Sequence, residues 1–302
     1  MARKNLAVIG GGAISGHYLV ALCGSETYNL CALCDINPDC KSRNLYKDVP
    51  FYDDHMNMID ETDIDTAIIS SPPATHFRIA DELLNSGVNV LLEKPMCAEF
   101  ESIEKLYRMA ESAKKEVICL FHWRYADEVK FLKEYIKDKN IKKIKTHICD
   151  NYCEPDTLNI KKECLDLLGA WYDSGVNAIS YIDLLIEIDN ATLKSSEVIN
   201  DNKSGLPVFV KKVYLCDGIE IEIVVDWRYD TREKISVITF EDGEIMVSHT
   251  NQTVVCGEKV IFNSPVGDRL ESHYLNMLGD KSFKDDNEKI TKRIHTVLFK
   301  ES

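Results

Sequence analysis

Residues 1–121 alternate short apolar runs with segments in which apolar residues recur at helical spacing. Each apolar run is followed by a glycine, a proline or a polar residue, which is typical of buried strands, and each intervening segment predicts a helix. Apolar strands that alternate with helices indicate a parallel sheet covered on both faces. The predicted strands are 6–9, 30–34, 65–70, 88–92 and 117–121, and the predicted helices are 13–23, 76–86 and 103–114.

After residue 121 the pattern changes to runs in which apolar and polar residues alternate, as in strands with one buried face. Asp242-Gly243 lies between two such runs and predicts a hairpin turn. We therefore expect a largely antiparallel open sheet with helices on one side, and an α/β fold of two domains, residues 1–121 and 122–302. The predicted strands are 144–149, 208–216, 219–227, 235–240, 244–248 and 253–262, and the predicted helices are 128–139, 176–186, 270–278 and 290–298.

The composition allows two hydrophobic cores, since the chain has 302 residues, 45% of them hydrophobic and 28% charged. The net charge of −14 argues against nucleic acid as a partner, because phosphate binding needs an excess of Lys and Arg. No apolar run reaches the length of a membrane span, and no signal peptide precedes the first strand. We expect a cytoplasmic protein without membrane contact.

The chain contains eleven cysteines, an odd number, and several lie within apolar runs. This pattern predicts buried free thiols in a reducing compartment rather than a disulfide framework. Cys31 and Cys34 have the spacing of a metal-binding pair, but on a strand they point to opposite faces, and no second pair completes a zinc site. We expect no bound metal.

A glycine-rich turn, Gly10-Gly11-Gly12-Ala13-Ile14-Ser15, lies between the first strand and the first helix, where a Rossmann dinucleotide fingerprint belongs. Gly10 permits a tight turn. Gly12 lets the backbone approach a diphosphate, which then caps the helix N-terminus. A plain strand-to-helix turn is the alternative for this fragment considered alone.

Asp35 ends the second strand, near the distance from Gly12 at which an acidic side chain meets the adenosine ribose hydroxyls of NAD. A carboxylate there repels the 2′-phosphate of NADP, so we expect NAD. Lys41 and Arg43 leave NADP as an alternative. A helix-capping role before Ile36-Asn37-Pro38 is the other interpretation of Asp35.

Two further loops follow strands of the predicted parallel sheet, whose carboxyl ends are where ligands bind. Ser70-Ser71-Pro72-Pro73-Ala74-Thr75-His76 could run along the nicotinamide half of the cofactor. His76 is either a surface residue at a helix N-terminus or a catalytic one. In Glu93-Lys94-Pro95 a lysine lies beside an acid, which suits proton transfer or substrate polarisation.

In the second half, Asp173 and Asn177 are four residues apart at the start of a predicted helix and would project from one face of it. A carboxylate can take a proton and an amide can hold a substrate hydroxyl. The alternative is that Asp173 or Ser174 caps the helix.

These segments together resemble the Gfo/Idh/MocA oxidoreductase family, which carries a glycine turn, an acidic strand end, a Pro-Pro-x-x-His loop and Glu-Lys-Pro in this order. The resemblance implies that Lys94 is the catalytic lysine and that the peptide bond before Pro95 is cis. The implied cofactor contacts are Gly10, Gly12, Ala13, Ile14, Asp35, Ser71, Pro72, Pro73, His76, Glu93 and Lys94.

The second half is similar to the arabinose and galactose 1-dehydrogenases of that family, with Asn177 where the family more often has His. Residues 121–126, 226–228 and 244–248 support this likeness. It implies that a sugar's anomeric hydroxyl is oxidised to a lactone. Lys94, Asp173 and Asn177 would be catalytic, with His122, Arg124, Asp173 and Asn177 binding the sugar.

Two departures concern the sugar. Residues 152–171 lack the expected loop rich in tryptophan and glycine, and Asp150 lies only approximately where that branch has an acidic substrate contact. Another polyol, cyclitol or ketone is therefore an alternative substrate, and a non-catalytic sensor of NAD and sugar is an alternative function. A homo-oligomer is expected, because strands rich in Ile and Val leave an apolar sheet face to cover.

Overall fold

The computed structural model describes residues 3–23, 25–155, 157–264 and 269–300. The chain divides into two compact units, one made of residues 1–122 and 268–292, the other of residues 123–267 and 293–302.

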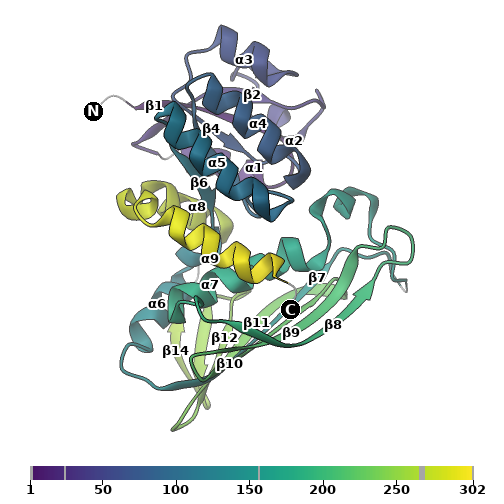
Figure 1. The fold of residues 1–302 in the computed structure, drawn as a ribbon, viewed down its shortest axis with the longest axis vertical. Helices are drawn as coiled ribbons and strands as arrows, with labels where there is room; N and C mark the ends of the chain where they lie inside the picture. The colour runs from purple at the N-terminus through teal and green to yellow at the C-terminus, as the bar shows by residue number, and fades with distance from the viewer. Residues whose placement is uncertain (1–2, 24, 156, 265–268, 301–302) are drawn as a thin grey trace. The chain divides into compact units, whose positions relative to one another are not determined.

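The first unit is built on a six-stranded sheet in the order β3-β2-β1-β4-β5-β6, with every pairing parallel (Figure 1). This is the strand order of a doubly wound Rossmann sheet, and it confirms the predicted parallel arrangement. The order reverses between β1 and β4, so the crevice at their carboxyl ends is where a ligand is expected. The strands are β1 Lys4–Ile9, β2 Tyr28–Cys34, β3 Phe51–Tyr52, β4 Thr66–Ile69, β5 Asn89–Glu93 and β6 Val117–Leu120.

Helices of this unit pack their apolar stripes on the sheet and on each other. Helix α4 packs on β4, β5 and α5, whereas α1 packs on β2 and on α8. Gly87, with φ of +79°, follows α4 at the position where an unstrained left-handed residue ends a helix. The helices are α1 Ser15–Cys23, α2 Lys41–Leu45, α3 His55–Glu61, α4 Pro73–Asn85, α5 Phe100–Ala113 and α8 Arg269–Gly279.

Residues 268–292 belong to the first unit, although the sequence placed them with the second half. The contacts explain this. The side chain of Asn287, at the start of α9 Asn287–Phe299, accepts a hydrogen bond from the N–H of Cys119 at 2.9 Å and donates one to the Cys119 carbonyl at 3.0 Å. Asn287 thus serves β6 as a neighbouring strand would. The division between the units falls within α9.

The second unit contains an eight-stranded sheet in the order β14-β13-β12-β11-β7-β10-β9-β8. Only the β7–β10 pairing is parallel among these described strands, so the largely antiparallel prediction is confirmed. The strands are β7 Ile141–Asn151, β8 Thr192–Asn200, β9 Pro207–Cys216, β10 Ile219–Asp226, β11 Arg228–Phe240, β12 Glu244–Ser248, β13 Thr253–Cys256 and β14 Lys259–Asn263.

Helices α6 Asp127–Tyr135 and α7 Val176–Ile186 lie along one face of this sheet (Figure 1). The hydroxyl of Tyr181, in α7, bonds Thr146 of β7 at 2.5 Å and Ser236 of β11 at 2.6 Å. These bonds satisfy the buried hydroxyls and fix the helix over the sheet.

The opposite face of the sheet is not the apolar surface that the sequence suggested. At its centre Glu222 of β10 lies 3.1 Å from Lys145, 3.6 Å from Lys211 and 3.8 Å from Lys143. The expectation of an uncovered apolar face is therefore wrong for β7, β9 and β10. The buried Ile side chains of β7 and β10, among them Ile144, Ile148, Ile221 and Ile223, belong to the core.

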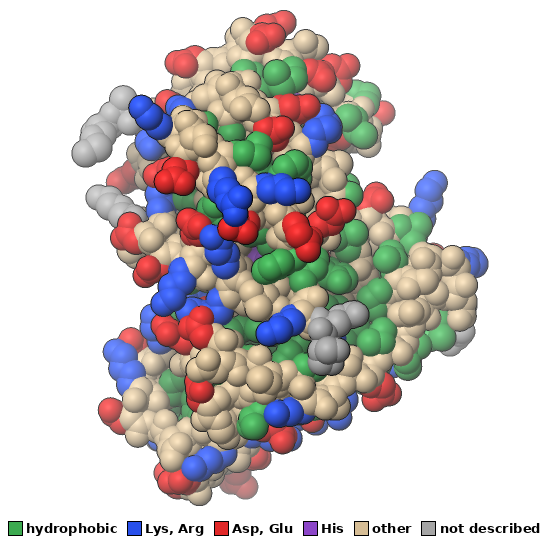
Figure 2. All heavy atoms as spheres, in the orientation of Figure 1, with side chains coloured by type: hydrophobic (Ala, Val, Ile, Leu, Met, Phe, Trp, Pro, Cys, Tyr) green, Lys and Arg blue, Asp and Glu red, His purple; other side chains and the backbone are tan. Residues whose placement is uncertain are grey.

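Ten cysteines have described side chains, and all ten are free thiols, most of them buried, as predicted. No helix within the described ranges is long and apolar enough to cross a bilayer. On the face shown in Figure 2, basic side chains are interspersed with acidic ones rather than gathered into a patch.

Candidate active site

The glycine turn begins where β1 ends, and its first residue fits only as glycine. Gly10 has φ of +100°, and a Cβ added there would lie 2.4 Å from the backbone nitrogen of Ser71 and 2.6 Å from the carbonyl carbon of Ser70. The turn after β1 and the loop after β4 therefore touch backbone to backbone, at the point where the strand order reverses.

The rest of the turn is open to a ligand. Gly12 and Ala13 are exposed, and a Cβ on Gly12 would meet nothing within 4 Å. In the described part of the chain, no hydrogen bond uses the N–H of Gly12, Ala13 or Ile14. Ser15 replaces the third fingerprint glycine, and its buried hydroxyl donates to the Gly12 carbonyl at 2.7 Å. Exposed N–H groups ahead of a helix suit a diphosphate.

Asp35 lies beside this turn. Its Oδ2 accepts a hydrogen bond from the N–H of Gly11 at 2.5 Å, and its Oδ1 accepts one from the N–H of Asn37 at 2.7 Å. The helix-capping interpretation is wrong, because the next helix begins only at Lys41 and Cys40 is its N-cap residue. The carboxylate is held at the edge of the turn, where a ribose would follow a bound diphosphate.

His76 is not a surface residue, which corrects one of the two interpretations of its position. Its side chain is fully buried, with Nε2 at 2.8 Å from the carbonyl oxygen of Ser71 and Nδ1 at 3.2 Å from that of Pro95. Burial lowers the pKa of His76, and the charge of nearby Lys94 lowers it further. The ring ties the Pro-Pro loop to the Glu-Lys-Pro loop.

Glu93 lies in the core beneath Lys94. Its Oε1 accepts hydrogen bonds from the hydroxyls of Tyr18 and, at 2.8 Å, Tyr274, and its Oε2 accepts one from the N–H of Lys94 at 2.9 Å. Burial raises the pKa of Glu93, while the opposing charge of Lys94 and the donated bonds lower it. Neither tyrosine was predicted from the sequence as part of the site.

Lys94 is partly exposed at the carboxyl end of β5, and the bond to Pro95 is cis, as predicted. Its backbone is held on both sides, by the Glu93 carboxylate at its N–H and by His76 at the next carbonyl. His122 begins a short 3-10 helix, His122–Tyr125, just after β6 of the same sheet. Its Nδ1 is 3.2 Å from Nδ1 of His273, and its ring centroid is 5.1 Å from that of Tyr274.

In the second unit, Asp173 lies in a π-helical turn, Trp171–Gly175, that continues directly into α7. Neither Asp173 nor Ser174 is an N-cap, so the capping interpretation is wrong. The amide of Asn177 donates to the Asp173 carbonyl at 3.3 Å, as the four-residue spacing requires. A Cβ on Gly175 would lie 2.7 Å from the Trp171 ring, so the turn needs glycine there.

Buried polar groups fix this turn to the sheet. The hydroxyl of Ser174 donates to Asp150 at 2.9 Å and accepts from the indole N–H of Trp227 at 3.1 Å. The other Asp150 oxygen is 3.0 Å from the ammonium of Lys234. Both carboxylate oxygens of Asp150 thus bond groups of the protein, although the sequence suggested a substrate contact near this position.

Comparison with known proteins adds to this geometry. The model of the Gfo/Idh/MocA family, described as an oxidoreductase family with an NAD-binding Rossmann fold, matches residues 4–121. Residues 4–121 therefore belong to the Gfo/Idh/MocA oxidoreductase family.

Curated relatives support this family. An uncharacterized oxidoreductase of Schizosaccharomyces pombe is 32% identical over 72 residues, which cover 24% of this chain and 20% of that protein. The rhizopine catabolism protein MocA of Rhizobium meliloti is 27% identical over 139 residues, which cover 45% and 43% of the two chains. The chain spans less than half of the length of these relatives.

Solved structures share the fold over nearly the whole chain. KijD10, a 3-ketoreductase from Actinomadura kijaniata in complex with NADP and TDP-benzene, has a TM-score of 0.83 at 13% identity and covers 98% of this chain and 96% of its own. GenD2 from gentamicin A biosynthesis, in complex with NAD, has a TM-score of 0.82 at 14% identity, with 99% and 93% covered. At these identities the likeness shows the fold.

Arg124 has structural partners in the second unit. One guanidinium nitrogen donates to the Ser180 carbonyl at 2.8 Å and to Asp183 at 2.9 Å. Asp183 is fully buried and also pairs with Arg293 of α9. The predicted sugar contact at Arg124 remains a prediction, since a second guanidinium nitrogen would have to make it.

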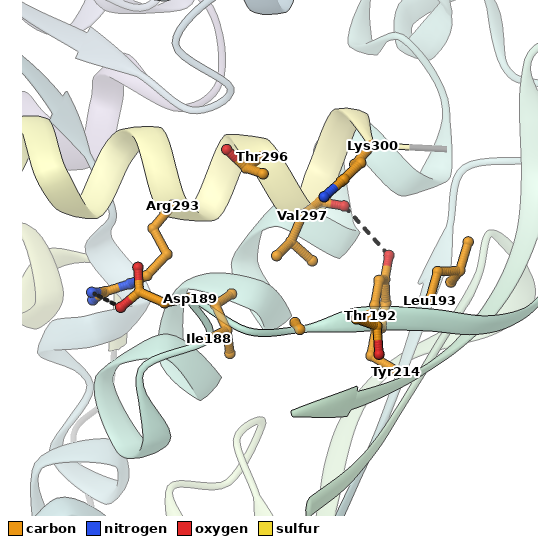
Figure 3. Close-up of a pocket in the computed structure, with 10 residues that line it drawn as sticks. Ile188, Asp189, Thr192, Leu193, Tyr214, Arg293, Thr296, Val297 and Lys300 are labelled. Carbon is orange, nitrogen blue, oxygen red and sulfur yellow. Dashed lines mark hydrogen bonds and ion pairs between the residues drawn. The ribbon is translucent and has the colours of Figure 1, made fainter. Parts of the chain in front are cut away.

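A cavity of about 300 Å³ lies between α9 and strands β8 and β9 of the second unit (Figure 3). In its lining Arg293 bonds Asp189 at 3.2 Å and the Tyr214 hydroxyl donates to the Val297 carbonyl at 3.4 Å. None of the predicted site residues lines it. Within the described ranges no three His, Cys, Asp or Glu side chains are grouped as metal ligands.

Proposed function

We propose that this chain is an NAD-dependent dehydrogenase that oxidises the anomeric hydroxyl of an aldose to a lactone. The observation that carries the proposal is Lys94, held between Glu93 and the His76 network at the sheet edge where the glycine turn offers its N–H groups. The cofactor fits because Gly12 leaves the turn open and Gly10 fixes it against Ser71.

NAD is preferred over NADP in this proposal. The Asp35 carboxylate is fixed at the turn by the Gly11 N–H and would repel a 2′-phosphate. Arg43, the alternative 2′-phosphate ligand, donates to the Pro38 carbonyl at 2.9 Å and lies 4.4 Å over the Phe51 ring.

The bound dinucleotide supplies the hydride acceptor for the C–H bond that breaks at the anomeric carbon. Lys94 donates a hydrogen bond to the substrate oxygen. Asp173, or water, receives the hydroxyl proton as the C–O bond becomes the lactone carbonyl. Asn177 and His122 hold the ring hydroxyls. Positioning supplies most of the acceleration, because the side chains contribute acid–base chemistry only.

A panel of aldoses and cyclitols with NAD and NADP, and of keto-sugars with NADH and NADPH, each followed by the absorbance of the reduced nicotinamide, tests the proposal. We expect turnover of an aldose with NAD. Turnover of a cyclitol or ketone alone would identify the alternative substrates, which the fold also accommodates in KijD10 and in a putative myo-inositol dehydrogenase from Sinorhizobium meliloti. NADH binding without turnover of any compound would favour the sensor.

A homo-oligomer and a reducing, cytoplasmic location belong to the same proposal. An apolar surface that could be covered in an oligomer lies at one end of the second sheet. Val237, Met246 and Val255 are cross-strand neighbours there, and Met246 is 46% exposed. Support for the location is the set of free thiols. Light scattering of the purified protein measures the assembly, and a monomer at all concentrations would contradict it.

A further inference from the structure

A buried carboxylate beneath Lys94 is held by tyrosines from two helices that are distant in sequence. Tyr18 lies in α1, the helix that follows the glycine turn, and Tyr274 lies in α8, near the end of the chain. Both rings are fully buried, and their centroids are 4.2 Å apart. Both hydroxyls donate to one oxygen of Glu93, while the other oxygen accepts the Lys94 N–H.

This arrangement is costly for a purely structural role. A carboxylate loses its hydration on burial, and apolar residues of similar volume often stabilise such a position as well or better. Glu93 is 4% exposed and needs its three donors to offset that loss. A buried carboxylate at this position therefore calls for a further explanation, and its hydrogen bond to the backbone of Lys94 offers one.

The charges around Glu93 also point to Lys94. The neighbouring thiol of Cys119 is uncharged, because burial raises the pKa of Cys119 well above its ordinary value. The His122 ring lies against the Tyr274 ring, with centroids 5.1 Å apart. The positive charge that opposes Glu93 is that of Lys94.

We propose that Tyr18, Glu93 and Tyr274 are positioning residues that fix the backbone and the charge environment of Lys94. Helix α8 is then part of the active site, although it lies far from the cofactor motifs in sequence. This inference rests on the proposed function, in which Lys94 contacts the substrate oxygen. It adds that the cofactor helix α1 and helix α8 both act on Lys94 through one carboxylate.

Two variants, Tyr274→Phe and Tyr18→Phe, each remove one donor to Glu93 and keep the ring. Tyr107→Phe is the matched control, since Tyr107 is also a buried tyrosine of the first unit and its hydroxyl donates to Asn287 at 3.3 Å, away from Glu93. For each we measure kcat, KM for the sugar, the dissociation constant of NADH and the thermal unfolding midpoint.

A readout without cofactor or substrate is the NMR signal of Lys94 after reductive methylation with ¹³C-formaldehyde, assigned by its loss in Lys94→Arg. We expect Tyr274→Phe to lower kcat by at least about tenfold, because small misplacements of a catalytic group have large effects on rate. NADH affinity should be unchanged, and the Lys94 signal should shift in its position or in its pH titration. Tyr107→Phe should leave kcat and the signal unchanged.

Wild-type kcat and an unmoved Lys94 signal in both tyrosine variants would overturn the inference while leaving the proposed function intact. So would an equal loss of kcat in Tyr107→Phe that follows the unfolding midpoint. If the wild-type protein turns over no compound, the proposed function fails. The Lys94 signal alone then decides whether Tyr18, Glu93 and Tyr274 fix Lys94. Glu93→Gln is a second variant of similar size, in which an NH2 group replaces one of the two accepting oxygens and faces a donor. It should lower kcat more than either tyrosine variant.

Discussion

Gly10 is constrained at once by its own backbone and by a neighbouring loop, which makes it the sharpest test at the scale of single residues. Gly10→Ala should lower the free energy of unfolding by at least about 2 kcal/mol, because a side chain is strained at φ of +100° and collides with the backbone of Ser71. Urea unfolding measures this. NADH binding, followed by fluorescence, should be lost as well.

Gly12→Ala is the matched comparison, since the space around Gly12 is open. It should keep the wild-type free energy of unfolding and weaken NADH binding alone, because the added methyl group stands where a diphosphate approaches. Equal NADH affinity in Gly12→Ala and the wild type would show that the cofactor does not approach this turn.

Asp35 sets the cofactor preference in our proposal. Asp35→Asn should raise the ratio of kcat/KM for NADP to that for NAD by at least about tenfold, because it removes a charge that repels the 2′-phosphate. Asp39→Asn makes the same charge change at an exposed position of the same loop and is the control. Equal changes in both variants would mean that net charge, rather than contact at Asp35, determines the preference.

At the scale of elements, hydrophobic runs predict strands well where burial is complete, as in β1, β4 and β5. Strand β8 escaped prediction because it lies at the sheet edge and most of its residues are exposed, so that no alternation marks it. Residues 253–262 were predicted as one strand but form two, β13 and β14. Gly257 turns the chain between them with φ of +58°.

The candidate site was predictable only where local pattern determines it. The glycine turn, Asp35 and Lys94 follow from their positions after strands. Tyr274 was not predictable, because it reaches Glu93 across most of the sequence and no local periodicity encodes that contact. His76 was misjudged in part for the same reason, since its partners come from a loop that follows another strand.

The contribution to stability of the contact between α9 and β6 can be measured. Asn287→Ala should lower the free energy of unfolding by about 3 kcal/mol, because it leaves both the N–H and the carbonyl of buried Cys119 without partners. Asn140→Ala, which removes an exposed bond to Glu241, should change it by less than about 0.5 kcal/mol. Similar losses in the two variants would show that Asn287 does not complete the strand.

At the scale of the whole molecule, stability should depend on pH through His76. Burial places the folded-state pKa of His76 below its unfolded value of about 6.5, so the unfolded chain binds the proton more readily. The stabilising contribution is complete above that value and is lost as the pH falls below it. The melting temperature of the wild type should therefore fall between pH 7 and pH 5, and His76→Gln, although less stable at pH 7, should show a smaller fall. Parallel curves for the two proteins would assign the dependence to other groups.

In the proposed reaction the hydroxyl proton passes to Asp173 or to water, and a double-mutant cycle of Lys94 and Asp173 distinguishes these two acceptors. Lys94→Ala alone should lower kcat/KM by at least about 100-fold, the usual scale for an acid–base group. If Asp173→Asn affects the same step, the double variant should have a kcat/KM close to that of the less active single variant. Two residues that act together in one step have non-additive effects. Asp166→Asn, an exposed neighbour, should combine with Lys94→Ala without any such coupling. If the fold reductions in kcat/KM of Lys94→Ala and Asp173→Asn instead multiply in the double variant, the two side chains act in separate steps. Water is then the proton acceptor.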